Sequence, residues 1–211
     1  MRFKMRSVNF IIIGLLFFSI CLKGQHRNVP QHFRHYNLEE GMSNNWAYCL
    51  LEDDLGFIWV GTRDGLNRFD GYEFKEYNIS NSALKGNNIT ILYQGADNTI
   101  WVGTSYSGLY RYSWDTDRMT QVSYVEGSSN ALSNNRIKAI ASAGNDHIWV
   151  GTNSGDINRV NIHTLEVDHP SSCRGLGRVM SMTNGSDGSL WIGTWDGLYR
   201  FGRRYCEYGA L

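Results

Sequence analysis

The sequence predicts an all-β fold, a β-propeller of about four four-stranded blades that form an incomplete ring. A phrase of the form IWVGT, followed by a turn and a run such as LYRF, occurs four times. Its tryptophans are separated by 42, 48 and 42 residues and lie at Trp59, Trp101, Trp149 and Trp191. Periods of about 40 to 45 residues with strand-like content are typical of propeller blades. The chain also has 23 glycines, two prolines and 28 aromatic residues, a usage that suits short strands joined by glycine turns.

Residues 1–25 are predicted to be a secretory signal peptide. Several basic residues at the start precede an apolar run from Phe10 to Leu22, which is short for a membrane span of about 20 residues. A small residue follows at Gly24, and cleavage is expected near Gly24 or Gln25. An uncleaved anchor is the alternative. The chain is therefore expected to be exported.

Residues 26–211 are predicted to form the partial propeller. In each unit the first strand is the apolar run before the tryptophan, and the second strand is the IWVGT element. The third strand is the LYRF-like run, and a fourth strand such as YEFKEY, ending at Tyr77, completes the blade. Glycine, aspartate and asparagine between these runs suit tight turns. The blade repeats are predicted at about 46–77, 88–122, 136–168 and 178–208, preceded by an orphan outer strand at 33–36.

The orphan strand indicates missing blades. FRHYNLEEGMSNN from Phe33 resembles FKEYNISNSALKGNN from Phe74, which is a fourth strand leading into the next blade. Such a strand often completes the last blade of a closed propeller, but the last unit has its own candidate fourth strand at Tyr205–Tyr208. An open arc would also expose an apolar blade face. The chain is therefore expected to be the N-terminal part of a longer protein.

The residues that recur in every copy have structural explanations. The tryptophans supply large buried area, and the glycines two residues later permit close approach between packed blades. The recurrent arginines could form an anion-binding ring, but the repeat favours stacking on aromatic rings or capping of carbonyls between blades. The glycines are Gly61, Gly103, Gly151 and Gly193, and the arginines are Arg68, Arg111, Arg159 and Arg200.

One turn departs from the others. Asp156 stands in the third copy where Gly108 stands in the second. Because aspartate enters left-handed backbone conformations at modest cost, the turn is expected to survive with Asp156 in that role.

Charge and cysteine content argue against a nucleic-acid surface and against a zinc site. Lys+Arg and Asp+Glu both total 20, so the formal net charge is zero and no basic surface for nucleic acid is indicated. Without the signal peptide, Cys49, Cys173 and Cys206 remain, and their spacing matches no zinc site. A bridge between Cys173 and Cys206 and a set of idle thiols are both open. No metal or other cofactor is expected.

The repeat also resembles a known family. The phrase D-x-x-G-x-I-W-V-G-T-x-x-G-L-x-R-[FY], opened by GMSNN at Gly41–Asn45, resembles the two-component regulator propeller repeat. The resemblance covers roughly Phe33 to Tyr208, although the last copy has GLGRVM in place of the LSNN type of opening. Such repeats form the periplasmic sensor region of hybrid two-component system regulators in gut Bacteroidetes and relatives.

The resemblance implies a larger parent protein with paired seven-bladed propellers, a membrane helix and a histidine kinase, which detects a glycan and regulates the genes for its utilisation. No phospho-acceptor helix, kinase nucleotide site or helix-turn-helix is found in the sequence. The chain would therefore be the N-terminal, periplasmic part of the sensor and not itself an enzyme. Its partners would be an oligosaccharide, the remaining blades and signalling domains of the parent, or another chain in a dimer.

Ligand candidates are the residues that break the repeat on one face. Alternating strand directions place the connection between blades and the turn between second and third strands on the same face. The residues there that a scaffold does not demand are Trp46, Arg63, Asp64, Tyr106, Trp195 and Asp196. Aromatic faces suit the C–H surface of sugars, and charged groups suit their hydroxyls. The structural alternative is that these side chains only cover neighbouring blades.

Two other functions are weaker alternatives. A secreted sialidase-like propeller enzyme would need a placed pair of carboxylates, and none stands outside the repeats. A propeller interaction scaffold of the WD type is disfavoured because the one WD dipeptide, Trp195–Asp196, lies in a predicted turn and because the chain begins with a predicted signal peptide.

Overall fold

The computed structural model describes residues 33–171, 173–202 and 206–208, so the predicted signal peptide lies outside the described residues. The chain divides into two units, Met1–His35 and Tyr36–Leu211, and every strand belongs to the second unit. Within the described residues all regular structure is β. No helix there has the length and apolar character needed to cross a bilayer.

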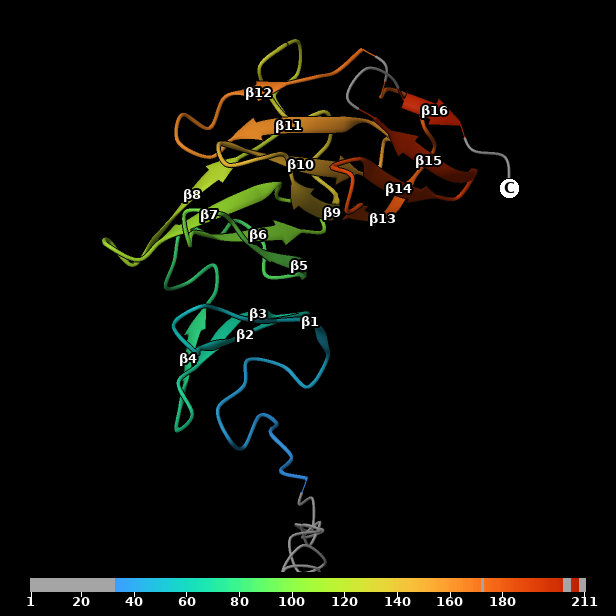
Figure 1. The fold of residues 1–211 in the computed structure, drawn as a ribbon. Coiled ribbons are helices and arrows are strands. Elements are labelled where there is room, and N and C mark those ends of the chain that lie inside the picture. Colours follow the sequence, from blue (N-terminus) through green and yellow to red (C-terminus); the bar gives the residue numbers. More distant parts are fainter. Residues whose placement is uncertain (1–32, 172, 203–205, 209–211) are drawn as a thin grey trace, which may run out of the picture. The chain divides into compact units, whose positions relative to one another are not determined.

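Four separate antiparallel sheets of four strands follow one another along the chain, and in each sheet neighbouring strands are also neighbours in sequence (Figure 1). We call these sheets blades 1 to 4. Blade 1 contains β1 (Ala47–Glu52), β2 (Ile58–Thr62), β3 (Gly65–Phe69) and β4 (Phe74–Tyr77). Blade 2 contains β5 (Ile89–Gln94), β6 (Ile100–Thr104), β7 (Leu109–Ser113) and β8 (Arg118–Val122). Blade 3 contains β9 (Ile137–Ser142), β10 (His147–Thr152), β11 (Ile157–Asn161) and β12 (Val167–Asp168), and blade 4 contains β13 (Val179–Asn184), β14 (Leu190–Thr194), β15 (Gly197–Phe201) and β16 (Cys206–Tyr208).

The first strand of every blade carries a bulge at the same repeat position. In blade 1 the pairing of β1 with β2 skips from Ala47 to Cys49, which leaves Tyr48 without a partner across the ladder. The corresponding residues in the other blades are Thr90, Lys138 and Met180. Thr90 uses its freedom to hydrogen bond the next blade, because its hydroxyl donates to the Ile137 carbonyl at 3.0 Å. Bulges of this kind bend a strand and re-aim its side chains.

The hydrophobic core lies between successive blades rather than within one of them. One cluster joins Trp59 and Leu66 of blade 1 to residues of blade 2 such as Ile100. A second joins Trp101 to blade 3, and a third joins blades 3 and 4. A four-stranded sheet cannot bury either of its faces alone, so each blade depends on its neighbours for this area.

Three of the repeated glycines lie where one blade meets the next. A Cβ added at Gly103 would lie 2.8 Å from Cγ2 of Ile137 in β9, and one at Gly61 would lie 2.7 Å from Cγ2 of Ile89. Gly151 has the same relation to Val179, at 2.6 Å. At Gly193 in blade 4 the same position meets only side-chain and backbone atoms of Ser181. Close approach between blades therefore requires glycine at the first three positions.

The four repeated arginines all have protein partners. The guanidinium of Arg68 lies over the rings of Phe57, Trp59 and Trp114 at 4.9, 5.8 and 5.2 Å and donates to the Tyr112 hydroxyl at 3.1 Å. Arg111 donates to the His163 carbonyl of blade 3 at 3.5 Å. Arg159 forms an ion pair with Asp168 at 2.7 Å, and Arg200 pairs with Asp187 and lies over the Trp191 ring.

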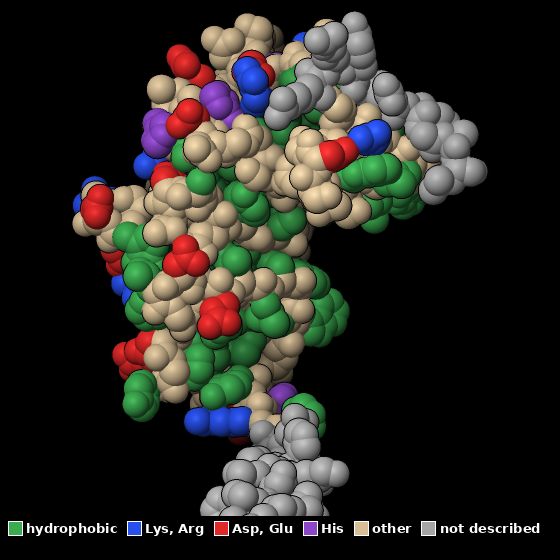
Figure 2. Space-filling model, viewed as in Figure 1, with side chains coloured by type: hydrophobic (Ala, Val, Ile, Leu, Met, Phe, Trp, Pro, Cys, Tyr) green, Lys and Arg blue, Asp and Glu red, His purple; other side chains and the backbone are tan. Residues whose placement is uncertain are grey.

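The two end blades expose positions that are buried elsewhere in the repeat. Leu50 in β1 is 69% exposed, whereas its counterparts Leu92 and Ile140, which pack against a preceding blade, are 8% and 6% exposed. At the other end Leu198 is half-buried, although its counterpart Leu109 is fully buried against a following blade. Hydrophobic side chains accordingly reach the surface beside β1 and again beside β13 and β14 (Figure 2). Both outer blade faces therefore lack the neighbour that the inner blades have.

Two local expectations from the sequence are wrong. Residues 33–36 form no strand, because a strand requires a neighbouring edge for its hydrogen bonds and each described sheet is complete with its own four strands. Instead, the Tyr36 ring packs edge-on against Phe69 at a centroid distance of 5.0 Å. In the turn of blade 3 the left-handed residue is Gly155, with φ of 88°, and not Asp156. Glycine adopts that conformation without the Cβ penalty, so the turn uses it one position earlier.

Cys49 and Cys173 are the cysteines whose side chains the structure describes. Cys173 is fully buried in the cluster between blades 3 and 4, and burial raises the pKa of the Cys49 thiol to about 12. The Cys206 side chain lies outside the described residues, so the bridge between Cys173 and Cys206 stays a prediction.

Asp117 links the outer parts of blades 1 and 2, and we expect the stability of this junction to depend on pH in the acid range. Its carboxylate accepts hydrogen bonds from the hydroxyls of Tyr77 and Tyr112, each at 2.8 Å, and from the Lys75 ammonium. Burial opposes ionisation of Asp117, but these hydrogen bonds outweigh it and lower the pKa to about 2 from an ordinary value of 3.8. Because the folded pKa is depressed, this junction stabilises the fold above about pH 4 and loses that contribution as the pH falls toward 2.

With Asp117 replaced by asparagine, the free energy of unfolding is therefore expected to fall less steeply between pH 4 and pH 2 than in the parent chain; this decrease is the acid limb. Urea unfolding of the chain at a series of pH values would measure this limb. Asp115→Asn, in the same turn and exposed, is the matched control and should leave the limb as it is in the parent chain. An equal acid limb in the Asp117 variant and the parent would contradict the prediction.

Candidate ligand-binding face

The turn between the second and third strands of each blade is held by the threonine that ends the IWVGT element. In blade 1 the Thr62 hydroxyl donates to the Gly65 carbonyl at 2.9 Å and accepts from the Asp64 N–H at 3.1 Å. The same pattern occurs at Thr104 in blade 2 and Thr194 in blade 4. These bonds use only backbone groups of the turn. The side chains at the tip are therefore not needed to form it.

A loop before the first strand of each blade docks on this turn through one backbone hydrogen bond. The bond joins the position four residues after the repeated tryptophan to the position thirteen residues before it. The donor and acceptor residues are Arg63 and Trp46 at 3.2 Å, Ser105 and Asn88 at 3.0 Å, Asn153 and Arg136 at 3.0 Å, and Trp195 and Arg178 at 3.1 Å. Each blade therefore presents two neighbouring side chains at this face, which we call the ligand-binding face.

Asparagines of the SNN motif shape the same loop in blades 1 and 3. The Asn44 side chain accepts from the Trp46 N–H at 2.8 Å, and Asn134 accepts from the Arg136 N–H at 2.8 Å. The preceding serine is tied to the blade, since the Ser43 N–H donates to the fully buried Asn67 side chain at 2.8 Å. Side chains of aspartate, asparagine and serine favour such local turns. The loop thus arrives in one conformation set by its own sequence.

Three arginine–aromatic pairs lie on the ligand-binding face. The Arg63 guanidinium lies 5.0 Å from the Trp46 ring centroid in blade 1, and Arg178 lies 4.4 Å from that of Trp195 in blade 4. These two pairs occupy the same two positions with arginine and tryptophan exchanged. The third pair crosses blades, because Arg136 of the blade 3 loop lies 4.5 Å from the Tyr106 ring of the blade 2 turn.

The aromatic members of these pairs remain open to solvent. Trp46, Tyr106 and Trp195 are 59%, 65% and 67% exposed. Trp195 is further held by Met180, the bulge residue of β13, because its indole N–H lies 2.9 Å from the Met180 sulfur. An exposed ring fixed on one side by an arginine or a methionine offers its other surface for stacking. Such a surface suits the C–H face of a sugar ring.

The six predicted ligand residues fall into these arrangements in different ways. Trp46 and Arg63 contact one another, whereas Tyr106 and Trp195 contact arginines that the sequence comparison did not single out. Asp64 is exposed and accepts a hydrogen bond from the Asn87 side chain, in the loop to blade 2, at 2.8 Å. Asp196 is exposed and lies against Gly177.

Arg136 and Arg178 are the residues of this face that reasoning from the sequence missed. Both stand thirteen residues before a repeated tryptophan, the position that Trp46 occupies in the first copy. Comparing this repeat position and its hydrogen-bonded partner as a pair would have identified Arg178, because Arg178 and Trp195 are the Trp46–Arg63 pair with the two residue types exchanged.

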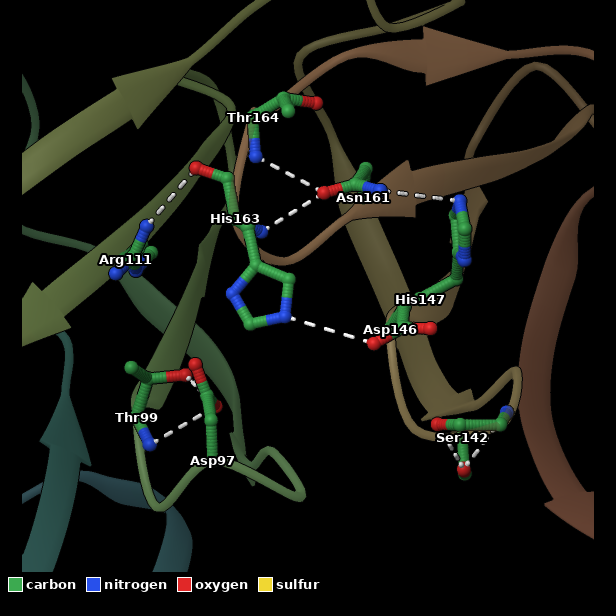
Figure 3. Close-up of polar contacts among 10 residues, drawn as sticks. Asp97, Thr99, Arg111, Ser142, Asp146, His147, Asn161, His163 and Thr164 are labelled. Carbon is green, nitrogen blue, oxygen red and sulfur yellow. Dashed lines mark hydrogen bonds and ion pairs between the residues drawn. The ribbon is translucent and has the colours of Figure 1, made fainter.

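The opposite face carries polar groups around the turns that join first to second and third to fourth strands. His163 and Asp146 form an ion pair at 3.6 Å, and Asn161 accepts from the N–H groups of His163 and Thr164 at 2.9 Å each (Figure 3). In the part of the chain that the structure describes, no hydroxyl or thiol hydrogen bonds to His163, and no group of acidic, histidine or cysteine side chains is placed to hold a metal. These contacts explain the shape of the turns.

Blades, inter-blade core and turns together define the class of protein: a β-propeller built from copies of one repeat. The model of the family described as Two component regulator propeller matches three segments of the chain, at residues 41–64, 83–106 and 131–154. Each matched segment runs from the loop before the first strand to the turn of the ligand-binding face.

Two proteins that resemble this chain are much longer than it. Histidine kinase P4 of Formosa agariphila is 40% identical over 74 residues, which are 35% of this chain and 5% of that protein. The extracellular domain of a hybrid two component system from B. thetaiotaomicron is 25% identical with a TM-score of 0.73, over 84% of this chain and 26% of that one. The chain thus spans about a quarter of the solved domain and a twentieth of the kinase.

Other propellers share the fold alone. Virginiamycin B lyase from Staphylococcus aureus is 19% identical with a TM-score of 0.62, over 78% of this chain and 55% of that one. Its likeness extends to the blade architecture and carries no activity across to this chain.

Proposed function

We propose that this chain is the ligand-sensing propeller portion of a hybrid two-component sensor, and that its ligand is an oligosaccharide bound on the ligand-binding face. The observation that carries the proposal is the set of exposed rings of Trp46, Tyr106 and Trp195, which lie at the same end of blades 1, 2 and 4 and each contact an arginine. The family of the repeat and its likeness to an extracellular domain of a two component system support the sensing role.

We further propose that the protein is exported and that the propeller works in the periplasm. Residues 1–25 would direct export, and the similarity to the extracellular domain from B. thetaiotaomicron supports a location outside the cytoplasm. The histidine kinase of the parent protein would then receive the signal across a membrane.

The exposed end faces support the proposal that further blades complete the ring. Leu50 and Leu198 occupy positions whose counterparts are buried against a neighbouring blade. The blades needed to cover them would come from the remainder of a seven-bladed parent or from another chain. Signalling domains beyond those blades would carry the kinase activity.

A glycan-binding screen followed by calorimetry tests the proposed ligand class. Oligosaccharides that bind the chain are expected to bind the Trp46→Ala/Trp195→Ala double variant at least about tenfold more weakly, because each stacking surface contributes binding free energy on the order of 1 kcal/mol. Tyr72→Ala, an exposed aromatic in the turn between β3 and β4 at the opposite face, should bind as the parent chain does. Failure of every oligosaccharide to bind, or equal binding by the double variant, would overturn the proposal.

A further inference from the structure

The arginines of the ligand-binding face differ from the repeated arginines in what satisfies them. Each repeated arginine has a hydrogen-bond or ion-pair partner, whereas the guanidinium groups of Arg63, Arg136 and Arg178 contact an aromatic ring and enter none of the ion pairs in the described part of the chain. All three are exposed. Their N–H donors are therefore open to a ligand.

Acidic side chains on the same turns are already engaged with the neighbouring loops. Asp64 accepts from the Asn87 side chain, and Asp156 accepts from the Gly175 N–H at 3.0 Å and from the Ser154 hydroxyl at 3.2 Å. Asp196 lies against the backbone at Gly177. The carboxylates of these turns therefore face the loops, and among the described residues the arginines of this face form no ion pair.

The aromatic ring beneath each arginine gives its charge a fixed direction. A guanidinium stacked on a ring contributes about 0.5–1 kcal/mol at an exposed site and keeps its planar edge of N–H groups in one orientation. Two parallel N–H groups on such an edge match the two oxygens of a carboxylate or a sulfate. Arginine presented in this way selects anions rather than hydroxyl groups.

We propose that the ligand is an anionic oligosaccharide, whose carboxylate or sulfate groups are bound by Arg63, Arg136 and Arg178. This inference rests on the proposed function, in which the same face binds an oligosaccharide. The arginines belong to blades 1, 3 and 4, so each would bind a charged group on a different sugar residue. The exposed sides of Trp46, Tyr106 and Trp195 bind the sugar rings between those groups.

The test compares three hexasaccharides of equal length: one of uronic acid units, one sulfated, and one neutral glucan. Calorimetry with the chain is expected to show binding of an anionic hexamer at least about tenfold tighter than that of the neutral one. The triple variant Arg63→Gln/Arg136→Gln/Arg178→Gln should lose that preference and the salt dependence of binding with it. Arg118→Gln, an exposed arginine of the outer strand β8, is the matched control and should retain both.

The outcomes separate this inference from the proposed function. Preference for the uronate or for the sulfated hexamer identifies which anion the arginines bind, and both results support the inference. Equal binding of the neutral hexamer, unaffected in the triple variant, overturns the anionic ligand while the proposed function stands. Equal binding of polyglutamate would reduce the face to a non-specific ion exchanger and also overturn the inference. If none of the hexamers and no other oligosaccharide binds, both proposals fail.

Discussion

Replacing Trp59 by alanine is expected to lower the free energy of unfolding by about 3–5 kcal/mol. The indole is fully buried between blades 1 and 2, with the rings of Tyr77, Tyr112 and Trp114 at centroid distances of 5.9, 4.9 and 5.8 Å. Its N–H also donates to the carboxylate of buried Asp53 at 2.6 Å. Alanine would leave a cavity in this junction and would deprive the Asp53 carboxylate of a partner, and both effects destabilise the fold.

Urea unfolding followed by circular dichroism measures this loss, and two other tryptophans provide controls. Trp46→Ala, at the exposed ligand-binding face, is expected to cost under about 1 kcal/mol. The comparison of Trp59→Phe with Trp101→Phe isolates the contribution of the hydrogen bond. Both variants remove an indole N–H at the same repeat position, but that of Trp101 has no partner in the described structure. Trp59→Phe should therefore cost more than Trp101→Phe. Equal losses for Trp59→Ala and Trp46→Ala would contradict the assignment of Trp59 to the core.

The Gly103→Val variant is expected to be destabilised by about 3 kcal/mol, the upper end of the usual effect of overpacking. A Cβ at this position would lie 2.5 Å from the Ile91 side chain and 2.8 Å from that of Ile137, which belongs to the next blade. Neither isoleucine can move away without disturbing the core between blades 2 and 3. The extra methyl groups would therefore push the two blades apart.

Gly193→Val is the matched control, since it makes the same substitution at the same repeat position of blade 4. Its nearest obstacle is the Ser181 hydroxyl at 2.7 Å, which can rotate away, so the expected loss is under about 1 kcal/mol. The chemical denaturation midpoints of the two variants give the comparison. A loss at Gly193 as large as that at Gly103 would show that inter-blade contact does not set the glycine requirement.

The repeat makes most of the fold predictable from sequence. The IWVGT phrase is long enough to place the second strand of every blade, and the other strands follow from the turns on either side of it. The exceptions arise where the repeat is not obeyed. The segment before Ala47 resembles the fourth strand that begins at Phe74, but resemblance cannot supply the neighbouring edge that a strand requires.

The candidate site was only partly predictable, because its pairs are defined by contact and not by position. When the repeats are aligned, Trp46 and Arg178 occupy one position, and Arg63 and Trp195 occupy another. Comparing the residues at a single aligned position therefore shows no shared side chain type. The pairing becomes visible only when the two positions joined by the backbone hydrogen bond are considered together. The Tyr106–Arg136 pair spans two blades, and no alignment of single repeats brings its members together.

The threonine that holds each turn has a consequence for how such proteins diversify. Thr62 and its counterparts hold the turn through hydrogen bonds to its backbone groups. The two side chains displayed beside the turn therefore contribute little to the stability of the fold. Substitutions there can change the chemistry of the face with little effect on stability, whereas changes at the buried Trp59 or at Gly103 between blades destabilise the fold. A gene duplicated blade by blade would thus inherit a rigid frame together with a small set of interchangeable positions. A new ligand specificity would then require only a few mutations on the ligand-binding face.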